Sequence, residues 1–348
     1  MAEGVRQAGA DPITLPLADG GEGTLWALHR TLGGSWLSVA TVNPWARPIT
    51  ASMLHWPKTA TVVVELAEAA GWTTAYGRQR AALTASTFGV GIMLKAALDS
   101  GAARIVVGLG GSLTTDGGSG LLTALGARFL DRQGHALPPG GGALAELVRV
   151  DWSHLDPRLG TVELVALADV DNPLTGPDGA SRTFARQKGA SADEIELLEV
   201  ALSHYREVVR QRTEVDGPGS GAAGGTGAAL RLLGASLLPG SQAVLDMIGF
   251  KDRLAESQAL FTGEGRFDRQ SLRGKAPAVA LELARAAAVP SCLIVGKRAQ
   301  ELDLDGVASL VLDLAPPDLP VGQVRRQIRS LLAERARDAV GQLLPASA

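Results

Sequence analysis

The sequence predicts an α/β fold whose parallel strands are covered on both faces. Short β-branched apolar runs alternate with alanine- and leucine-rich stretches of helical length. These runs are continuously apolar rather than alternating with polar residues, which is typical of strands buried on both faces. At roughly 150 residues per domain, the 348 residues favour two domains. No repeat or long linker marks a boundary, so a discontinuous second domain agrees with the sequence as well as a sequential one.

The elements follow each other in an order typical of this class. We expect strands at residues 61–65, 104–108, 162–168, 259–262, 291–295 and 309–312. We expect helices at residues 86–99, 118–130, 192–212, 222–233, 276–287 and 321–344. The last of these carries apolar residues at helical spacing and arginines on its other side, which predicts a docking helix with a solvated basic face.

Composition and charge exclude several classes of protein. The 33 Lys+Arg and 36 Asp+Glu residues give a net charge of −3, so the basic footprint of a nucleic-acid-binding protein is missing. One cysteine, Cys292, rules out a disulfide framework and fits a reducing compartment. We find no apolar run near ~18 residues and no signal-peptide pattern. We therefore expect a cytoplasmic protein that acts on small molecules, without nucleic-acid or membrane partners; a homo-oligomer stays open.

Glycine is the unusual residue, with 43 in the chain against a usual share of ~7%. Glycines meet acids or hydroxyls at residues 18–24, 108–118, 168–176, 219–225, 262–268 and 274–277. Glycine lets backbone approach a ligand closely, and helix N-termini bind anions. A neighbouring carboxylate can hold Mg²⁺ or act as a general base. One such cluster is usually a turn, but several follow strands directly, where α/β sheets bind ligands, and together they favour phosphoryl transfer.

Standard nucleotide motifs do not account for these clusters. A P-loop is missing, because Gly274-Lys275 is followed by Ala276. Residues 219–224 match G-x-G-x-x-G, but a polar, turn-like segment precedes them instead of a strand. Lys275 stands before a helix with Pro277 in its first turn, where a phosphate is favoured. Lys188 is another basic residue in a glycine-containing motif that could contact a phosphate.

Six motifs in order carry a family resemblance. They are Asp19-Gly20-Gly21-Glu22-Gly23-Thr24, Gly110-Gly111-Ser112-x-Thr114-x-Asp116-Gly117-Gly118, Asp169-Val170-x-Asn172-Pro173-Leu174-x-Gly176, Phe184-x-x-Gln187-Lys188-Gly189-Ala190, Gly221-Ala222-Ala223-Gly224-Gly225 and Thr262-Gly263-Glu264-Gly265-Arg266-x-Asp268-x-Gln270. From residue 15 to about residue 315, the sequence resembles the bacterial type-1 glycerate kinase family. The resemblance implies ATP- and Mg²⁺-dependent phosphorylation of glycerate, usually to 2-phosphoglycerate.

The resemblance also implies an architecture. We expect a flavodoxin-like (Rossmann-like) parallel-sheet domain built from both chain ends, residues 1–60 and 235–348. A second α/β domain, residues 61–234, would be inserted in it, with the active site in the cleft. Members of the family normally begin with a strand and a Pro-Asp-Ser-Phe-Lys loop, whereas residues 5–9 here resemble the end of the helix that follows. We therefore expect that strand, with its acid, serine and lysine, to be absent.

The expected site residues fall into three groups. The catalytic group has Asp169 as the base for the attacking hydroxyl, together with Lys275 and Asp268. The Mg²⁺ ligands would come from Asp19, Glu22, Asp116 and Glu264. Substrate and phosphates would lie on Gly110, Gly111, Ser112, Thr114, Asn172, Lys188, Gly224 and Gly225. Which acid is the base and which holds the metal stays open.

Two alternatives to this function remain at the level of the sequence. The expected N-terminal truncation fits a catalytically impaired homologue that only binds glycerate or nucleotide. A kinase for another small hydroxy acid is also consistent with the motifs. Within the glycerate kinase interpretation, either 2-phosphoglycerate or 3-phosphoglycerate is a product that the residues allow.

Overall fold

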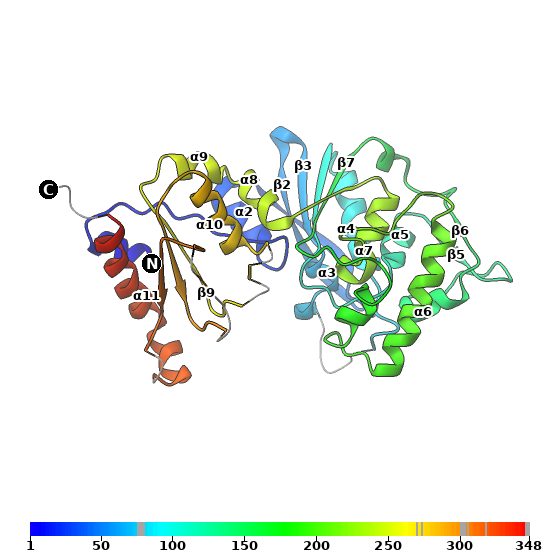
Figure 1. Cartoon of the computed structure of the whole chain (residues 1–348). Coiled ribbons are helices and arrows are strands. Elements are labelled where there is room, and N and C mark those ends of the chain that lie inside the picture. The colour runs from blue at the N-terminus through cyan, green and yellow to red at the C-terminus, as the bar shows by residue number, and fades with distance from the viewer. Residues whose placement is uncertain are drawn as a thin grey trace. The chain divides into compact units, whose positions relative to one another are not determined.

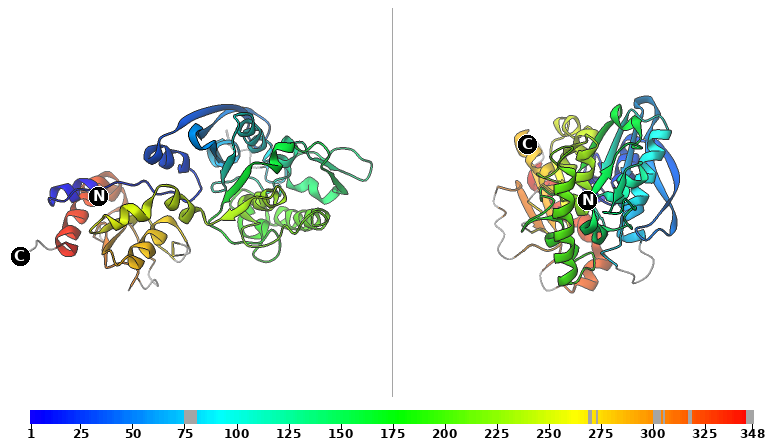
Figure 2. Two further views of the ribbon diagram at one scale, coloured as in Figure 1. Left: turned by 90° about the horizontal axis from the view of Figure 1, so that it is seen from above. Right: turned by 90° about the vertical axis from the view of Figure 1, so that its right-hand side faces the viewer.

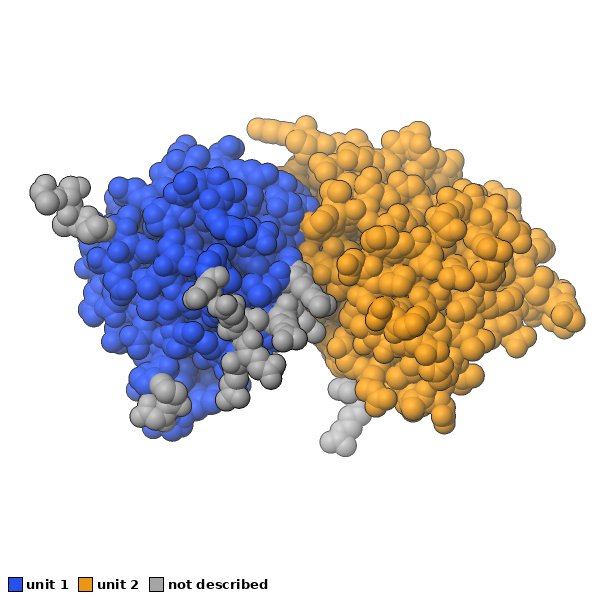
Figure 3. Space-filling model, in the orientation of Figure 1, with its two compact units in different colours: residues 1–17, 241–348 blue, residues 18–240 orange. Residues whose placement is uncertain are grey.

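The computed structural model describes the whole chain except residues 75–80, 269–270, 273, 300–303, 305, 317–318 and 345–348. The chain divides into two compact units (Figure 3): unit 1 comprises Met1–Leu17 and Ser241–Ala348, and unit 2 comprises Ala18–Gly240. The first boundary therefore falls after Leu17 instead of near residue 60, where the sequence suggested it. The reason is a hairpin within residues 35–56 that pairs with the strand at residues 61–65 and so joins unit 2.

Unit 2 is built on a mixed sheet with strand order β1-β2-β3-β4-β7-β8. Its strands are β1 (Ser35–Val42), β2 (Pro48–Trp56), β3 (Thr61–Glu65), β4 (Arg104–Gly108), β7 (Glu163–Leu167) and β8 (Ser236–Leu238). From β3 onward neighbouring strands run parallel, as predicted, whereas β1 and β2 form an antiparallel hairpin. The carboxyl ends of β3, β4, β7 and β8 consequently meet at one edge of the sheet.

Helices cover both faces of this sheet, as its continuous apolar strands predicted. Figure 1 shows α2 on one face, and α4, α5 and α7 on the other. On β3, Val62 and Val64 belong to the large core beneath α4, α5 and α7, while the equally buried Val63 lies on the opposite face. The helices of this unit are α2 (Thr24–Leu32), α3 (Ala67–Ala70), α4 (Phe88–Asp99), α5 (Ser119–Ala124), α6 (Ala192–Val209) and α7 (Ala222–Leu232).

One expected helix of unit 2 is shorter than predicted. The helix expected over residues 118–130 ends at Ala124, and residues 128–130 form strand β5 (Arg128–Leu130), which pairs with β6 (Arg149–Asp151). Gly126 breaks the helix: its φ is +109°, and a Cβ there would lie 2.0 Å from the carbonyl oxygen of His154. The backbone therefore turns sharply where alanine and leucine content had favoured a continuous helix.

Unit 1 is built on a smaller parallel sheet with the strand order β11-β10-β9. One face packs against α1 and α11, which lie side by side (Figures 1 and 2), and the other packs against α10. The apolar stripe of the C-terminal helix is thus confirmed as a docking face, through Ala336, Ala339 and Val340. The elements are α1 (Ala2–Gln7), α8 (Gly240–Met247), α9 (Phe250–Ala255), β9 (Leu260–Glu264), α10 (Ala276–Ala286), β10 (Ser291–Val295), β11 (Leu310–Asp313) and α11 (Val321–Leu343). Among the described residues, we find no helix with the length and apolar character needed to span a membrane.

Candidate functional site

The loop at residues 19–23 lies directly against the carboxyl end of β4. The Gly110 N–H donates a hydrogen bond to the Gly20 carbonyl at 3.2 Å. A Cβ at Gly108 would lie 2.3 Å from the Gly20 oxygen, and one at Gly110 would lie 2.4 Å from the Gly21 Cα. Glycine is required here because two backbones touch. Gly110, expected to cradle a phosphate, therefore serves first to join the two loops.

Two of the expected acids meet at the same edge of the sheet. A Cβ at Gly240 would lie 2.0 Å from the backbone oxygen of Asp19 and 3.2 Å from Oδ1 of Asp169. Asp169 follows β7 and is half-buried. The Glu22 side chain lies beside Gly111, whose added Cβ would be 3.1 Å from the Glu22 Cγ. The structure thus brings Asp19 close to Asp169. It also brings Glu22 close to the glycine loop after β4, which comprises residues 109–118.

Lys188 is buried beneath this glycine loop. Its ammonium group donates hydrogen bonds to the Ser112 hydroxyl at 2.7 Å and to the Thr114 carbonyl at 2.6 Å. Burial lowers the pKa of Lys188 to about 7, although the negative charge of Asp116 acts in the opposite direction. Lys188, Ser112 and Thr114 were each expected to contact phosphate. Because Lys188 and Thr114 are 4% and 0% exposed, these two hold the loop from inside.

Asp116 has a structural role, and its expected role as a metal ligand stays a prediction. Its carboxylate is fully buried and accepts hydrogen bonds from the Thr87 N–H at 2.8 Å and the Thr87 hydroxyl at 2.9 Å. It also accepts the N–H groups of Gly118 and Gly120. Burial raises the pKa of Asp116, and these hydrogen bonds oppose that shift. The carboxylate therefore ties together the starts of α4 and α5.

Gly224 and Gly225 lie where two backbones pack closely together. Both lie at the start of α7 with left-handed backbone, at φ of +67° and +93°. A Cβ at Gly224 would lie 2.0 Å from the Thr114 oxygen, and one at Gly225 would lie 2.7 Å from the Gly117 Cα. The space beside these two glycines is filled by the glycine loop after β4. The structure thus gives both glycines a packing role, and phosphate binding by their backbone stays a prediction.

Asn172 stabilises its own loop. Its side-chain amide donates to the Asp178 carbonyl at 2.7 Å, and its backbone carbonyl accepts the Gly221 N–H at 2.9 Å. These bonds connect the loop after β7 with the start of α7. Substrate contact by Asn172 stays a prediction.

Three expected residues belong to unit 1, at the carboxyl end of β9. Lys275 Nζ lies 3.2 Å from Oε1 of Glu264, while the other carboxylate oxygen of Glu264 is buried without a hydrogen-bond partner among the described residues. Lys275 is also the residue before α10, a helix start without a side-chain cap. Asp268 forms an ion pair with Arg266 at 3.5 Å. The structure thus brings Glu264 and Lys275 together.

Glu65 is a buried acid at the carboxyl end of β3 that the sequence analysis did not single out. It ends β3, is 4% exposed, and accepts the backbone N–H groups of Leu25 and Gly23 at the start of α2. Burial raises the pKa of Glu65 to about 7, and the nearby charges of Glu68 and Glu22 act in the same direction. An acid directly at the end of a predicted strand was the available signal, the same one that identified Asp169.

The described residues include no group of three or more His, Cys, Asp or Glu side chains arranged around a metal position. The sheet edge where the carboxyl ends of β3, β4, β7 and β8 meet carries acids, a hydroxyl and a glycine loop that a buried lysine holds. Acids and backbone amides at the ends of parallel strands define an α/β enzyme that positions a small polar or anionic substrate.

Comparison with known proteins identifies the family. The sequence profile described as "Glycerate kinase family" matches residues 1–344, and the chain belongs to this family. It is 37% identical over 342 residues to a protein named glycerate kinase from Bacillus subtilis (strain 168), covering 96% of this chain and 89% of that one. It is 40% identical over 272 residues to glycerate 2-kinase from Escherichia coli (strain K12), covering 77% of this chain and 71% of that one. A crystal structure assigned as glycerate kinase 2 from Salmonella typhimurium LT2 matches with a TM-score of 0.84 and 34% identity, over 98% of this chain and 91% of that one.

The packing role of Gly224 can be tested by substitution. Gly224→Ala adds a Cβ 2.0 Å from the Thr114 oxygen, whereas Gly234→Ala has a similar positive φ and nothing within 4 Å. We expect Gly224→Ala to lower the free energy of unfolding by about 2 kcal/mol more than Gly234→Ala, because the control carries backbone strain without the clash. Urea denaturation measures both. Equal losses would show that the space beside Gly224 is open.

Glu65 should make stability depend on pH. Because its pKa rises from 4.5 to about 7 on folding, the folded state binds more protons between these values. The free energy of unfolding should therefore fall as pH rises from 4.5 to about 7, by at most about 3 kcal/mol. Glu65→Gln should flatten this slope in denaturation curves at pH 5 and pH 7.5, while Glu163→Gln, an exposed control, should keep it. An unchanged slope in Glu65→Gln would contradict the assignment.

Proposed function

We propose that this chain is an ATP-dependent glycerate kinase, which transfers the γ-phosphoryl group of ATP to a hydroxyl of D-glycerate. Membership of the glycerate kinase family supports the proposal, and the relative named glycerate 2-kinase favours the 2-hydroxyl and hence 2-phosphoglycerate. Within the structure, one observation carries it: Asp169 and Asp19 lie together at the sheet edge that also holds the glycine loop over Lys188.

Asp169 is the residue that we propose as the general base. Its half-buried carboxylate would accept the proton of the glycerate hydroxyl while that oxygen forms its bond to the γ-phosphorus and ADP leaves. Backbone N–H groups of the loop after β4 and the Ser112 hydroxyl would orient the substrate. Asp268 and Lys275 are proposed as further participants from unit 1, with Lys275 supplying positive charge next to the start of α10.

The residues of unit 1 fit a magnesium ion. One carboxylate oxygen of Glu264 is buried and has no hydrogen-bond partner among the described residues. Carboxylate oxygen is the hard ligand that Mg²⁺ prefers, and Mg²⁺ in kinases is held by one or two carboxylates together with phosphates and water. When bound, the ion would neutralise charge on the β- and γ-phosphates. Asp19 and Glu22, in unit 2, are separately proposed as acids that bind Mg²⁺.

The activity itself is tested with purified protein, ATP, MgCl₂ and D-glycerate in a coupled assay for ADP. We expect glycerate-dependent ADP formation, with a phosphomonoester at the 2-hydroxyl detected by phosphorus NMR. A panel of other small hydroxy acids should give lower kcat/KM. No ADP formation with glycerate, or a higher kcat/KM for another acid, would contradict the proposal.

Asp169→Asn tests the proposed base. Removing a general base lowers kcat by about 10²- to 10⁴-fold, so we expect at least a hundredfold loss in steady-state kinetics with the KM values little changed. Asp171→Asn is the matched control, since Asp171 is an exposed acid of the same loop, and it should keep wild-type kcat. A loss of less than about tenfold in Asp169→Asn, which is ~1.4 kcal/mol, would exclude Asp169 as the base.

A further inference from the structure

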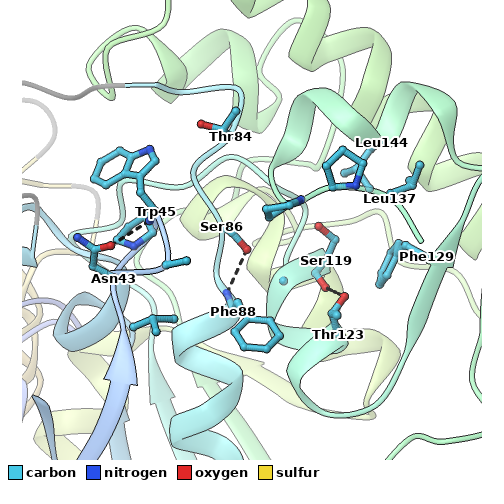
Figure 4. A pocket seen from close by; sticks show the side chains of 16 residues that line it. Asn43, Trp45, Thr84, Ser86, Phe88, Ser119, Thr123, Phe129, Leu137 and Leu144 are labelled. Carbon is cyan, nitrogen blue, oxygen red and sulfur yellow. Dashed lines mark hydrogen bonds between the residues drawn. The ribbon is translucent and has the colours of Figure 1, made fainter. Parts of the chain in front are cut away.

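Unit 2 contains a pocket that none of the expected site residues lines. It encloses about 460 Å³, within the ~300–1,000 Å³ typical of small-molecule sites. Its walls are mostly apolar and aromatic, and Figure 4 shows Trp45 on one side and Phe129 with Leu137 on the other. No charged side chain is found among the described residues that line it. A ligand, or the part of a ligand that enters, should therefore be uncharged, flat and largely apolar.

Polar groups at defined positions accompany these walls. The Asn43 side chain, which is 2% exposed, and the hydroxyls of Ser86, Ser119 and Thr123 line the pocket. Asn43 is held rigidly, because its side-chain oxygen accepts the N–H groups of Trp45 and Arg47. A few fixed polar groups in an apolar pocket give a ligand its orientation.

The pocket lies at the same edge of the sheet as the candidate site. β2 runs antiparallel to β3 and pairs Met53 with Val64, so the turn between β1 and β2 extends past the carboxyl end of β3. That turn supplies residues 42–46 of the pocket wall. The starts of α4 and α5 supply Phe88 and Ser119. These are the segments that follow the carboxyl ends of β3 and β4.

Hydrogen bonds of Asp116 connect the pocket wall with the glycine loop after β4. Asp116 accepts the N–H groups of Thr87 and Gly120, and Gly120 itself lines the pocket. Two residues before Asp116, the Thr114 carbonyl accepts the hydrogen bond from Lys188. Asp116 and the backbone of residues 114–116 therefore link the pocket wall to the loop over Lys188.

We propose that this pocket binds the adenosine part of ATP, with the triphosphate outside it on the side of the glycine loop. The inference rests on the proposed function, which requires two substrates. Glycerate is small and anionic, and phosphates are charged, so the nucleoside is the part of either substrate that suits an uncharged aromatic pocket. The aromatic rings of Trp45 and Phe88 would contact the base, and the hydroxyls and Asn43 would orient it.

Adenosine, which lacks phosphate, is the probe that isolates this pocket. Trp45 reports binding by its fluorescence, and the variants are Trp45→Phe, Phe88→Ala and the control Leu197→Ala, an exposed residue of α6 outside the pocket. We expect adenosine to change the emission of the wild type but not of Trp45→Phe, and ATP to compete with it.

Phe88→Ala should weaken adenosine binding at least fivefold, as loss of an aromatic contact to a base does. It should raise the KM for ATP at least as much while the KM for glycerate stays within twofold, and Leu197→Ala should match the wild type.

The outcomes separate this inference from the proposed function. Adenosine affinity and KM for ATP that are unchanged in Phe88→Ala would overturn the pocket assignment while leaving glycerate kinase activity intact. Saturable binding of an apolar compound that does not compete with ATP would assign the pocket to an effector and would also overturn it. Competitive adenosine binding at Trp45 in a protein that fails to phosphorylate glycerate would support the pocket and contradict the proposed substrate.

Discussion

The buried ammonium group of Lys188 is the interaction on which the candidate site depends. It reaches the Ser112 hydroxyl and the Thr114 carbonyl from inside the protein, and Lys188 and Thr114 are almost inaccessible to water. Leaving such buried polar atoms without partners costs about 1–3 kcal/mol each. Asp116, the neighbouring buried charge, is satisfied by backbone N–H groups at the starts of α4 and α5. The loop after β4 is thereby tied both to Lys188 and to the starts of α4 and α5.

Glycine supports this arrangement in a way that the sequence could not distinguish from ligand binding. Glycine is needed both where a backbone approaches a phosphate and where two protein backbones touch. At Gly110 and Gly224, the space a Cβ would need is taken by residues 21 and 114. At Gly265 and Gly274 an added Cβ would meet none of the described residues within 4 Å. The order of the motifs indicated the family. The role of each glycine, in contrast, could be assigned only from the way distant loops pack against it.

The fold was predictable where strands are buried on both faces, because continuous apolar runs such as those of β3 and β10 have no other explanation. The β1–β2 hairpin was missed for the opposite reason: its strands are partly exposed and alternate in character, as Leu37 and Val39 show beside the more exposed Trp36 and Ser38. That omission also displaced the expected domain boundary, since the hairpin joins unit 2 through β3. The approach of the Asp19 backbone and the Asp169 carboxylate beside Gly240 involves residues 150 positions apart, which no local pattern reports.

The most direct test of the account is the kcat/KM for glycerate phosphorylation by Lys188→Met, measured on protein shown to be folded by circular dichroism. The methionine keeps the buried length of the side chain but donates no hydrogen bond, so the loop after β4 loses its support. Misplacement of reacting groups by about 1 Å can cost about 10²-fold, and we predict at least a hundredfold lower kcat/KM, with Lys95→Met, an exposed control on α4, at the wild-type value. A folded Lys188→Met protein with kcat/KM within twofold of wild type would contradict the central role given to Lys188.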